Sequence, residues 1–181
     1  MLALAYAATH PDSVASLVLV GCGTFDTAAR QRMQAILDER TDGILRQRLE
    51  RLTEEYPDPN RRFRAFGEAV MSLYFYNCIP AKLKTEIHDA RAHHETWNDM
   101  VRLQQEGIYP AAFAAIKVPV LMLHGAFDPH PGNLIRDSLA PHLPQLEYRE
   151  WERCGHYPWL EKTVRVEFFS VLRPWLTEVT R

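Results

Sequence analysis

Two stretches decide the fold: VPVLMLHGAFD at residues 118–128 and RCGHYPWLE at residues 153–161. The first begins as a continuous apolar run, which is typical of a strand buried on both faces of a parallel sheet, and ends in a loop that carries Asp128. The second follows residues 146–151, whose alternating pattern predicts a half-exposed strand, and it carries His156. Open parallel sheets place functional groups beyond the carboxyl ends of their strands. We therefore expect Asp128 and His156 to be neighbours.

The rest of the chain supports an α/β architecture. Residues 16–20 form another apolar, β-branched run, closed by Gly21-Cys22-Gly23, and an alanine-rich helix precedes it and stops before Pro11. Helices are also predicted at residues 134–139 and 164–179. Residues 24–116 differ, because arginines alternate with acidic residues as on the solvated faces of short helices.

The predicted fold is thus α/β, with a partial, mainly parallel sheet of three strands and flanking helices. Residues 1–23 and 117–181 would form the core, and residues 24–116 an all-helical lid inserted into it. The 181 residues suit one ordinary domain.

Charge and cysteine content exclude several classes of function. The 21 basic and 23 acidic side chains give a net charge of −2, which favours neither nucleic acid nor an anionic membrane as partner. The three cysteines include no Cys-x-x-Cys pair, so a disulfide framework is not expected. The first basic residue is Arg30, so the apolar N-terminus lacks the charge of a signal peptide and a cytoplasmic location is expected.

Asp128 and His156 indicate acid–base chemistry only as a pair. Alone, Asp128 would be a helix cap or turn residue, and a loop histidine would be structural. Together, a carboxylate beside an imidazole fixes the tautomer of the ring and stabilises the imidazolium that forms when the ring accepts a proton.

These features resemble the C-terminal part of an α/β-hydrolase, of the proline-iminopeptidase or carboxylesterase kind. The matching features are the strand and Gly-x-x-Asp at residues 120–128, Gly155-His156, and the helix and strand at residues 2–20. The resemblance implies a triad in the chain order Ser, Asp, His, with Asp128 as the acid and His156 as the general base. It also implies hydrolysis of an ester, amide or related acyl bond in a small, largely apolar substrate beneath the lid, without a cofactor and without a metal.

The nucleophile is the point of departure from the family pattern. The motif Gly-x-Ser-x-Gly does not occur in the sequence, whose serines are Ser13, Ser16, Ser72, Ser138 and Ser170. The pattern would put the nucleophile a few residues before Met1. The chain alone is therefore expected to be inactive, with a sheet edge at residues 16–20 that favours self-association or pairing with a missing N-terminal segment.

Two other classes of function are compatible with parts of the sequence. The chain could be a non-catalytic remnant or subunit that binds a partner or ligand. Less favoured is an S-adenosylmethionine-dependent methyltransferase, suggested by Gly21-Cys22-Gly23 after a strand, because no further glycine and no second strand with an acid follow. His88, His93 and His94 lack the spacing of a metal site. Trp159, Tyr74 and Trp97 are predicted to line the substrate pocket, with Trp159 as the aromatic residue nearest the site.

Overall fold

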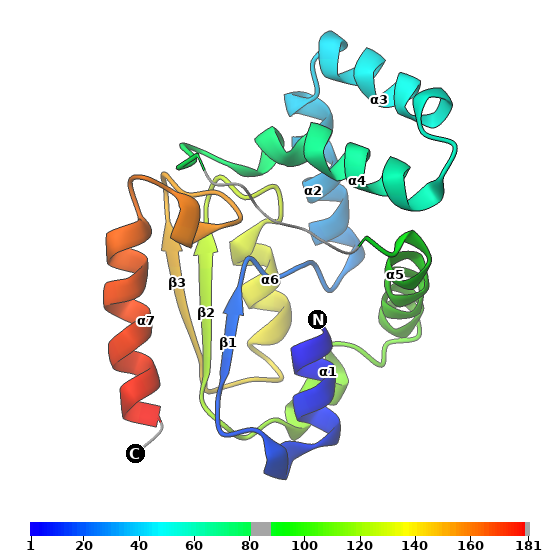
Figure 1. The fold of residues 1–181 in the computed structure, drawn as a ribbon. Coiled ribbons are helices and arrows are strands. Elements are labelled where there is room, and N and C mark those ends of the chain that lie inside the picture. The colour runs from blue at the N-terminus through cyan, green and yellow to red at the C-terminus, as the bar shows by residue number, and fades with distance from the viewer. Residues whose placement is uncertain (81–87, 180–181) are drawn as a thin grey trace.

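A sheet of three parallel strands organises the molecule in the computed structural model, which describes residues 1–80 and 88–179 (Figure 1). The strands are β1 (Leu17–Val20), β2 (Val120–Gly125) and β3 (Leu146–Trp151), in the order β1-β2-β3. Val120 is the register partner of both Leu17 and Leu146. The predicted α/β class and three-stranded parallel sheet are confirmed.

Burial of the strands follows their sequence patterns. All six residues of β2 are buried, as expected for the central strand with an unbroken apolar run. In β3 only Trp151 is buried and the exposed positions alternate at first, as at the edge of a sheet. β1 is the other edge strand of the described sheet.

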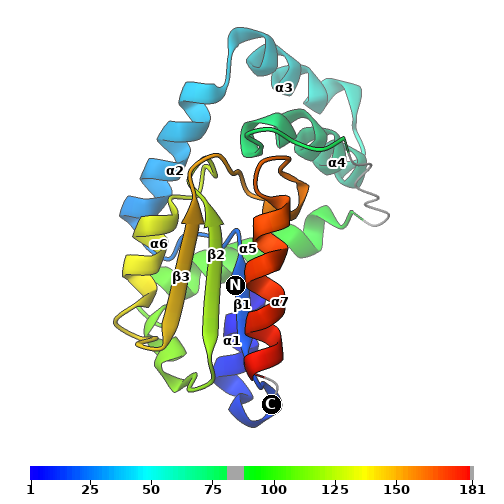
Figure 2. The same cartoon turned by 90° about the vertical axis from the view of Figure 1, so that its left-hand side faces the viewer.

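Helices cover both faces of the sheet. Helices α1 (Leu2–Thr9) and α6 (Gly132–Leu139), with the 3-10 helix η3 (Ala111–Ala115), pack on the face that carries Leu19 and Met122. Helix α7 (Arg165–Val179) packs on the opposite face through Phe168 and Trp175, and the views in Figures 1 and 2 agree on this layering. Pro174 lies inside α7.

Residues 24–116 lie between β1 and β2 and form the helical insert. Its helices are α2 (Thr27–Arg40), α3 (Gly43–Glu55), α4 (Pro59–Val70) and α5 (Ala90–Gln105), and the 3-10 helix η2 (Met71–Tyr74) follows α4. An aspartate caps each of the four α-helices by accepting a backbone N–H from the first turn, and these are Asp26, Asp42, Asp58 and Asp89. In Figure 1, α3 and α4 lie beyond the carboxyl ends of the strands.

Both ends of the helical insert belong to the core. Phe25 and Phe113 are buried and meet edge to face with their ring centroids 5.5 Å apart, and Ile116 is buried with them against α1. Large apolar side chains thus flank the charged tract on both sides and pack it against the sheet.

In the part of the chain that the structure describes, no helix has both the length and the apolar character needed to cross a bilayer.

Candidate active site

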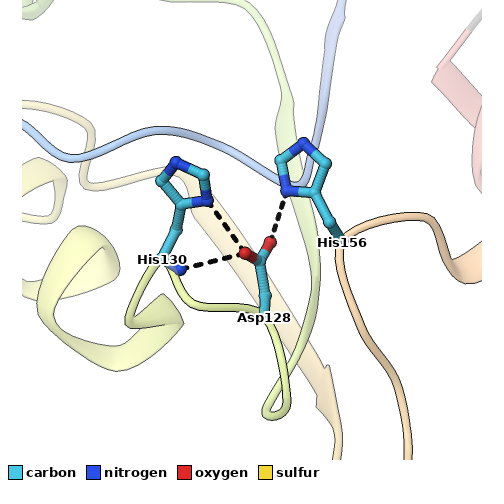
Figure 3. Close-up of side chains that lie close together, drawn as sticks. All are labelled: Asp128, His130 and His156. Atoms are coloured by element: carbon cyan, nitrogen blue, oxygen red, sulfur yellow. Dashed lines mark hydrogen bonds and ion pairs between the residues drawn. The ribbon is translucent and has the colours of Figure 1, made fainter. Parts of the chain in front are cut away.

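Asp128 lies in the loop between β2 and α6, and its side chain is fully buried. Its Oδ2 accepts a hydrogen bond of 2.6 Å from Nδ1 of His156. Its Oδ1 accepts two more, from Nδ1 of His130 at 2.8 Å and from the backbone N–H of His130 at 2.9 Å. Figure 3 shows the two imidazole rings side by side above one carboxylate. The structure therefore brings Asp128 and His156 together, 28 positions apart in the chain.

His156 is held by close backbone contacts on several sides. Its N–H donates to the carbonyl of Tyr74 at 2.8 Å. Gly21, with φ +57°, packs so closely that a Cβ there would lie 2.7 Å from the carbonyl oxygen of His156 and 2.9 Å from its ring. Gly21 thus admits the histidine loop at the point where the methyltransferase alternative would require S-adenosylmethionine.

Hydrogen bonding keeps the Asp128 carboxylate charged. Burial alone would raise the pKa of this carboxyl group, but the hydrogen bonds from His130 and His156, and the charge of those rings when protonated, bring the pKa below its usual value. Asp128 is consequently an anion at neutral pH. It can hold the Nδ1–H of His156 and stabilise an imidazolium there.

A third imidazole lies deeper beneath the carboxylate. His124 is fully buried at the end of β2, with Nε2 2.8 Å from the carbonyl oxygen of His130 and 3.4 Å from Oδ2 of Asp128. Burial lowers the pKa of His124, so this ring stays neutral and acts as a hydrogen-bond donor to the loop.

The aromatic residues predicted to line the pocket lie at different distances from the site. The Tyr74 ring is 5.6 Å from the His156 ring, centroid to centroid. The ring nearest His156 is that of Tyr157, at 4.7 Å, and not that of Trp159. Trp159 follows in a 3-10 turn that directs it toward Phe168 of α7, 6.1 Å away. Trp97 lies on α5, where it is 40% exposed and stacks with His93.

Three residues of the site were not identified from the sequence: His130, Gly21 and Glu161. The position of His130, two residues after Asp128, could have revealed it, since a loop carboxylate commonly accepts the backbone N–H two residues on. No sequence feature connects Gly21 with His156, or Glu161 with Tyr76 and Asn77, because these contacts join segments far apart in the chain.

Two groups of histidines bear on metal binding: the pair beside Asp128, and His93 on α5. In the described residues, Asp128, His130 and His156 offer ligand atoms that all lie within 4.8 Å of one another. One carboxylate and two imidazoles suit a divalent transition metal, but such an ion would have to displace both Nδ1 protons that now bind the carboxylate. His93 instead packs on the Phe63 ring, with centroids 4.6 Å apart.

Comparison with known proteins defines the class. The sequence model for the alpha/beta hydrolase fold matches residues 1–163, and the chain therefore belongs to the α/β-hydrolase family. No curated protein matches the sequence.

Solved structures agree with this assignment at the level of the fold. VinJ is similar with a TM-score of 0.61 at 17% identity, over 99% of this chain and 62% of VinJ. A bacterial membrane phospholipase A described as a virulence factor has a TM-score of 0.54 at 24% identity, over 99% of this chain and 54% of the phospholipase. Proline iminopeptidase from Mycobacterium smegmatis has a TM-score of 0.54 at 14% identity, over 99% of this chain and 62% of the iminopeptidase. The chain spans 54% to 62% of the length of these proteins and is a partial α/β-hydrolase fold.

Proposed function

We propose that this chain carries the acid and the base of a serine-hydrolase triad, with Asp128 as the acid and His156 as the general base. The proposed reaction is hydrolysis of an ester, amide or related acyl bond through a covalent intermediate. The observation that carries the proposal is the 2.6 Å hydrogen bond between Nδ1 of His156 and Oδ2 of Asp128, in loops that follow adjacent parallel strands.

The geometry supports a base role for His156. With Nδ1–H donated to an ionised carboxylate, Nε2 is the unprotonated nitrogen of the neutral ring. In Figure 3 this second nitrogen points away from Asp128. From that position it can take a proton from a nucleophile and return it to the leaving group.

A cavity in the helical insert, which we propose as the lid, supports the proposed substrate class. A cavity of about 370 Å³ lies between its helices, and its apolar lining residues are Leu37, Leu49, Phe66, Val70, Leu73 and Tyr74. Tyr74 borders both this cavity and the His156 ring. We therefore place a small, largely apolar acyl or alkyl group there, with its reacting bond near His156.

A larger hollow exists further from the site. It measures about 690 Å³ and lies among α3, α4 and α5, where Phe63 and His93 line it. Neither Asp128 nor His156 lines it, and none of its lining residues borders the His156 ring as Tyr74 does. A third cavity, of about 360 Å³, is lined by Asp128 itself but also by the charged Arg32 and Glu150. The cavity at Tyr74 is therefore favoured, because it combines a mostly apolar lining with nearness to His156.

The nucleophile is proposed to come from residues other than those of this chain. Within the described residues, no hydrogen bond joins a serine hydroxyl to His156. Cys22 is near the site, but burial raises the pKa of its thiol to about 11, which leaves too little thiolate for catalysis at neutral pH.

An esterase assay tests the proposal in two arms. The chain of 181 residues should hydrolyse p-nitrophenyl butyrate no faster than its Asp128→Ala and His156→Ala variants, because the nucleophile and its oxyanion hole supply most of the rate enhancement. The DNA before Met1 is then read for an in-frame Gly-x-Ser-x-Gly, and that longer product is assayed. Its turnover should fall on the order of 10⁴-fold in Asp128→Asn.

Two results would contradict the proposal. Turnover by the 181-residue chain that disappears in His156→Ala would mean that the nucleophile lies within it. An active longer product whose turnover is unchanged in Asp128→Asn would remove the role assigned to the acid.

A non-catalytic binding role is the second candidate. The absence of a serine bound to His156 among the described residues is the observation that favours it. It would be supported if no in-frame Gly-x-Ser-x-Gly precedes Met1, and excluded by triad-dependent turnover.

A further inference from the structure

Glu161 is a buried carboxylate that the triad chemistry does not use. Its side chain has no exposed surface, and it lies five residues after His156, at the end of the histidine loop. Oε1 accepts the backbone N–H of Tyr76 at 2.8 Å and that of Gly155 at 2.9 Å, and Oε2 accepts the backbone N–H of Asn77 at 2.7 Å. We infer that Glu161 is a positioning residue, which fastens the loop of the catalytic histidine to the end of the lid. This inference rests on the role proposed above for His156.

The burial of this charge requires an explanation. A carboxylate removed from water is costly unless hydrogen bonds satisfy it. Here the hydrogen-bond donors that the structure shows are all backbone N–H groups. Two belong to the consecutive residues Tyr76 and Asn77, which are 85 and 84 positions away along the chain, and the third belongs to Gly155 of the histidine loop itself. The carboxylate therefore joins two separate parts of the chain at one point.

Further contacts extend this junction. The N–H of Ile79 donates to the carbonyl of Leu160 at 2.7 Å, and the N–H of Lys162 donates to the carbonyl of Asn77 at 3.0 Å. On the other side of Glu161, the N–H of His156 donates to the carbonyl of Tyr74 at 2.8 Å. Residues 74–79, which follow the lid helix α4, thus run alongside residues 155–162.

Gly155 makes the contact close. A Cβ at this position would lie 2.0 Å from the carbonyl oxygen of Tyr74 and 2.9 Å from Oε1 of Glu161. The two segments consequently touch through their backbones, with no side chain to absorb a displacement. Movement of residues 74–77 would carry Gly155 with them and pull His156 away from Asp128.

His130 provides an internal reference. Its Nδ1 binds the same carboxylate, at Oδ1 of Asp128, but none of the donors to Glu161 in the described residues comes from the loop of His130. Loss of the Glu161 carboxylate should therefore disturb the hydrogen bond of His156 and leave that of His130 in place. A general loss of stability would affect both.

Nuclear magnetic resonance of the 181-residue chain can separate these outcomes. The ring Nδ1–H protons of His130 and His156 are assigned with the variants His130→Gln and His156→Gln, and amide exchange is followed at Tyr76, Asn77 and Gly155. In Glu161→Ala the His156 ring proton should be lost and exchange at the three amides should accelerate, while the His130 ring proton remains.

Two variants serve as comparisons. Glu161→Gln keeps one oxygen for Tyr76 and Gly155 and turns its NH₂ toward the N–H of Asn77, so only Asn77 should lose protection and the His156 proton should persist. Glu147→Ala removes a carboxylate that accepts the indole N–H of Trp175 at 2.9 Å, away from the histidine loop, and should leave both ring protons unchanged.

A folded Glu161→Ala chain that retains both ring protons overturns the inference. If Glu161→Ala does not fold, Glu161→Gln decides, because unchanged protection at all three amides is then incompatible with the proposed junction. Absence of the His156 ring proton from the wild-type chain would instead contradict the Asp128–His156 geometry, and with it the proposed function.

Discussion

Replacing Gly21 with alanine should both destabilise the protein and displace His156. Gly21 has φ +57°, a conformation that costs an alanine roughly 1–2 kcal/mol. The added Cβ would lie 2.7 Å from the carbonyl oxygen of His156 and 2.9 Å from ring atoms Cε1 and Nδ1. Because backbone is on both sides of this contact, we add the cost of overpacking and expect Gly21→Ala to lower the free energy of unfolding by about 2–5 kcal/mol in total.

Gly23, two residues further on, is the matched control. A Cβ there would meet no heavy atom within 4 Å, so Gly23→Ala should be neutral or stabilise the fold by about 0.4–1 kcal/mol through the unfolded state. Urea unfolding at pH 7, with the midpoint and slope compared for both variants and the wild type, measures the difference. Equal stability of Gly21→Ala and Gly23→Ala would refute the packing argument.

Three further predictions concern charge, thiols and the sheet edge. Because the folded-state pKa of Asp128 is lowered, this carboxylate stabilises the fold above its unfolded-state pKa of about 3.9, and the stabilisation is lost as the pH falls toward the folded-state pKa. In thermal unfolding between pH 7 and pH 3, the melting temperature of Asp128→Asn should therefore depend less on pH than that of the wild type. Cys22 and Cys154 are buried, and burial raises the pKa of their thiols to about 11 and about 12. A thiol reagent at pH 8 should therefore modify the half-buried Cys78 first, and the other two cysteines only when the protein unfolds. The free side of β1 should make the isolated chain dimeric or aggregated in sedimentation at micromolar concentration, and a stable monomer that binds no hydrophobic dye would contradict this.

The sheet could be predicted from the sequence because β1 and β2 are unbroken apolar runs, as burial within a parallel sheet demands, and β3 alternates, as a half-exposed strand does. The meeting of Asp128 with His156 could be predicted as well, because they follow consecutive parallel strands, which lie side by side in the sheet.

The remainder of the site depends on contacts between distant segments. The donors to Glu161 are backbone amides, which every residue except proline carries, so no residue type identifies them. Trp159 shows that closeness in sequence does not ensure contact. It is only three residues from His156, yet the turn at Pro158–Leu160 directs its ring to α7. Nearness along the chain did not predict nearness in space.

The place of the helical insert has a consequence for how the chain folds. Val20 and Leu123 are register partners, although the whole insert lies between them. The entropy of closing a loop grows only with the logarithm of its length, so doubling this excursion of about a hundred residues would cost only ~0.6 kcal/mol. Pairing over such a separation is, however, slow to form. The sheet can therefore accept inserts of very different length at little equilibrium cost, while the rate of β1–β2 assembly depends on how quickly the insert folds and brings its two ends together.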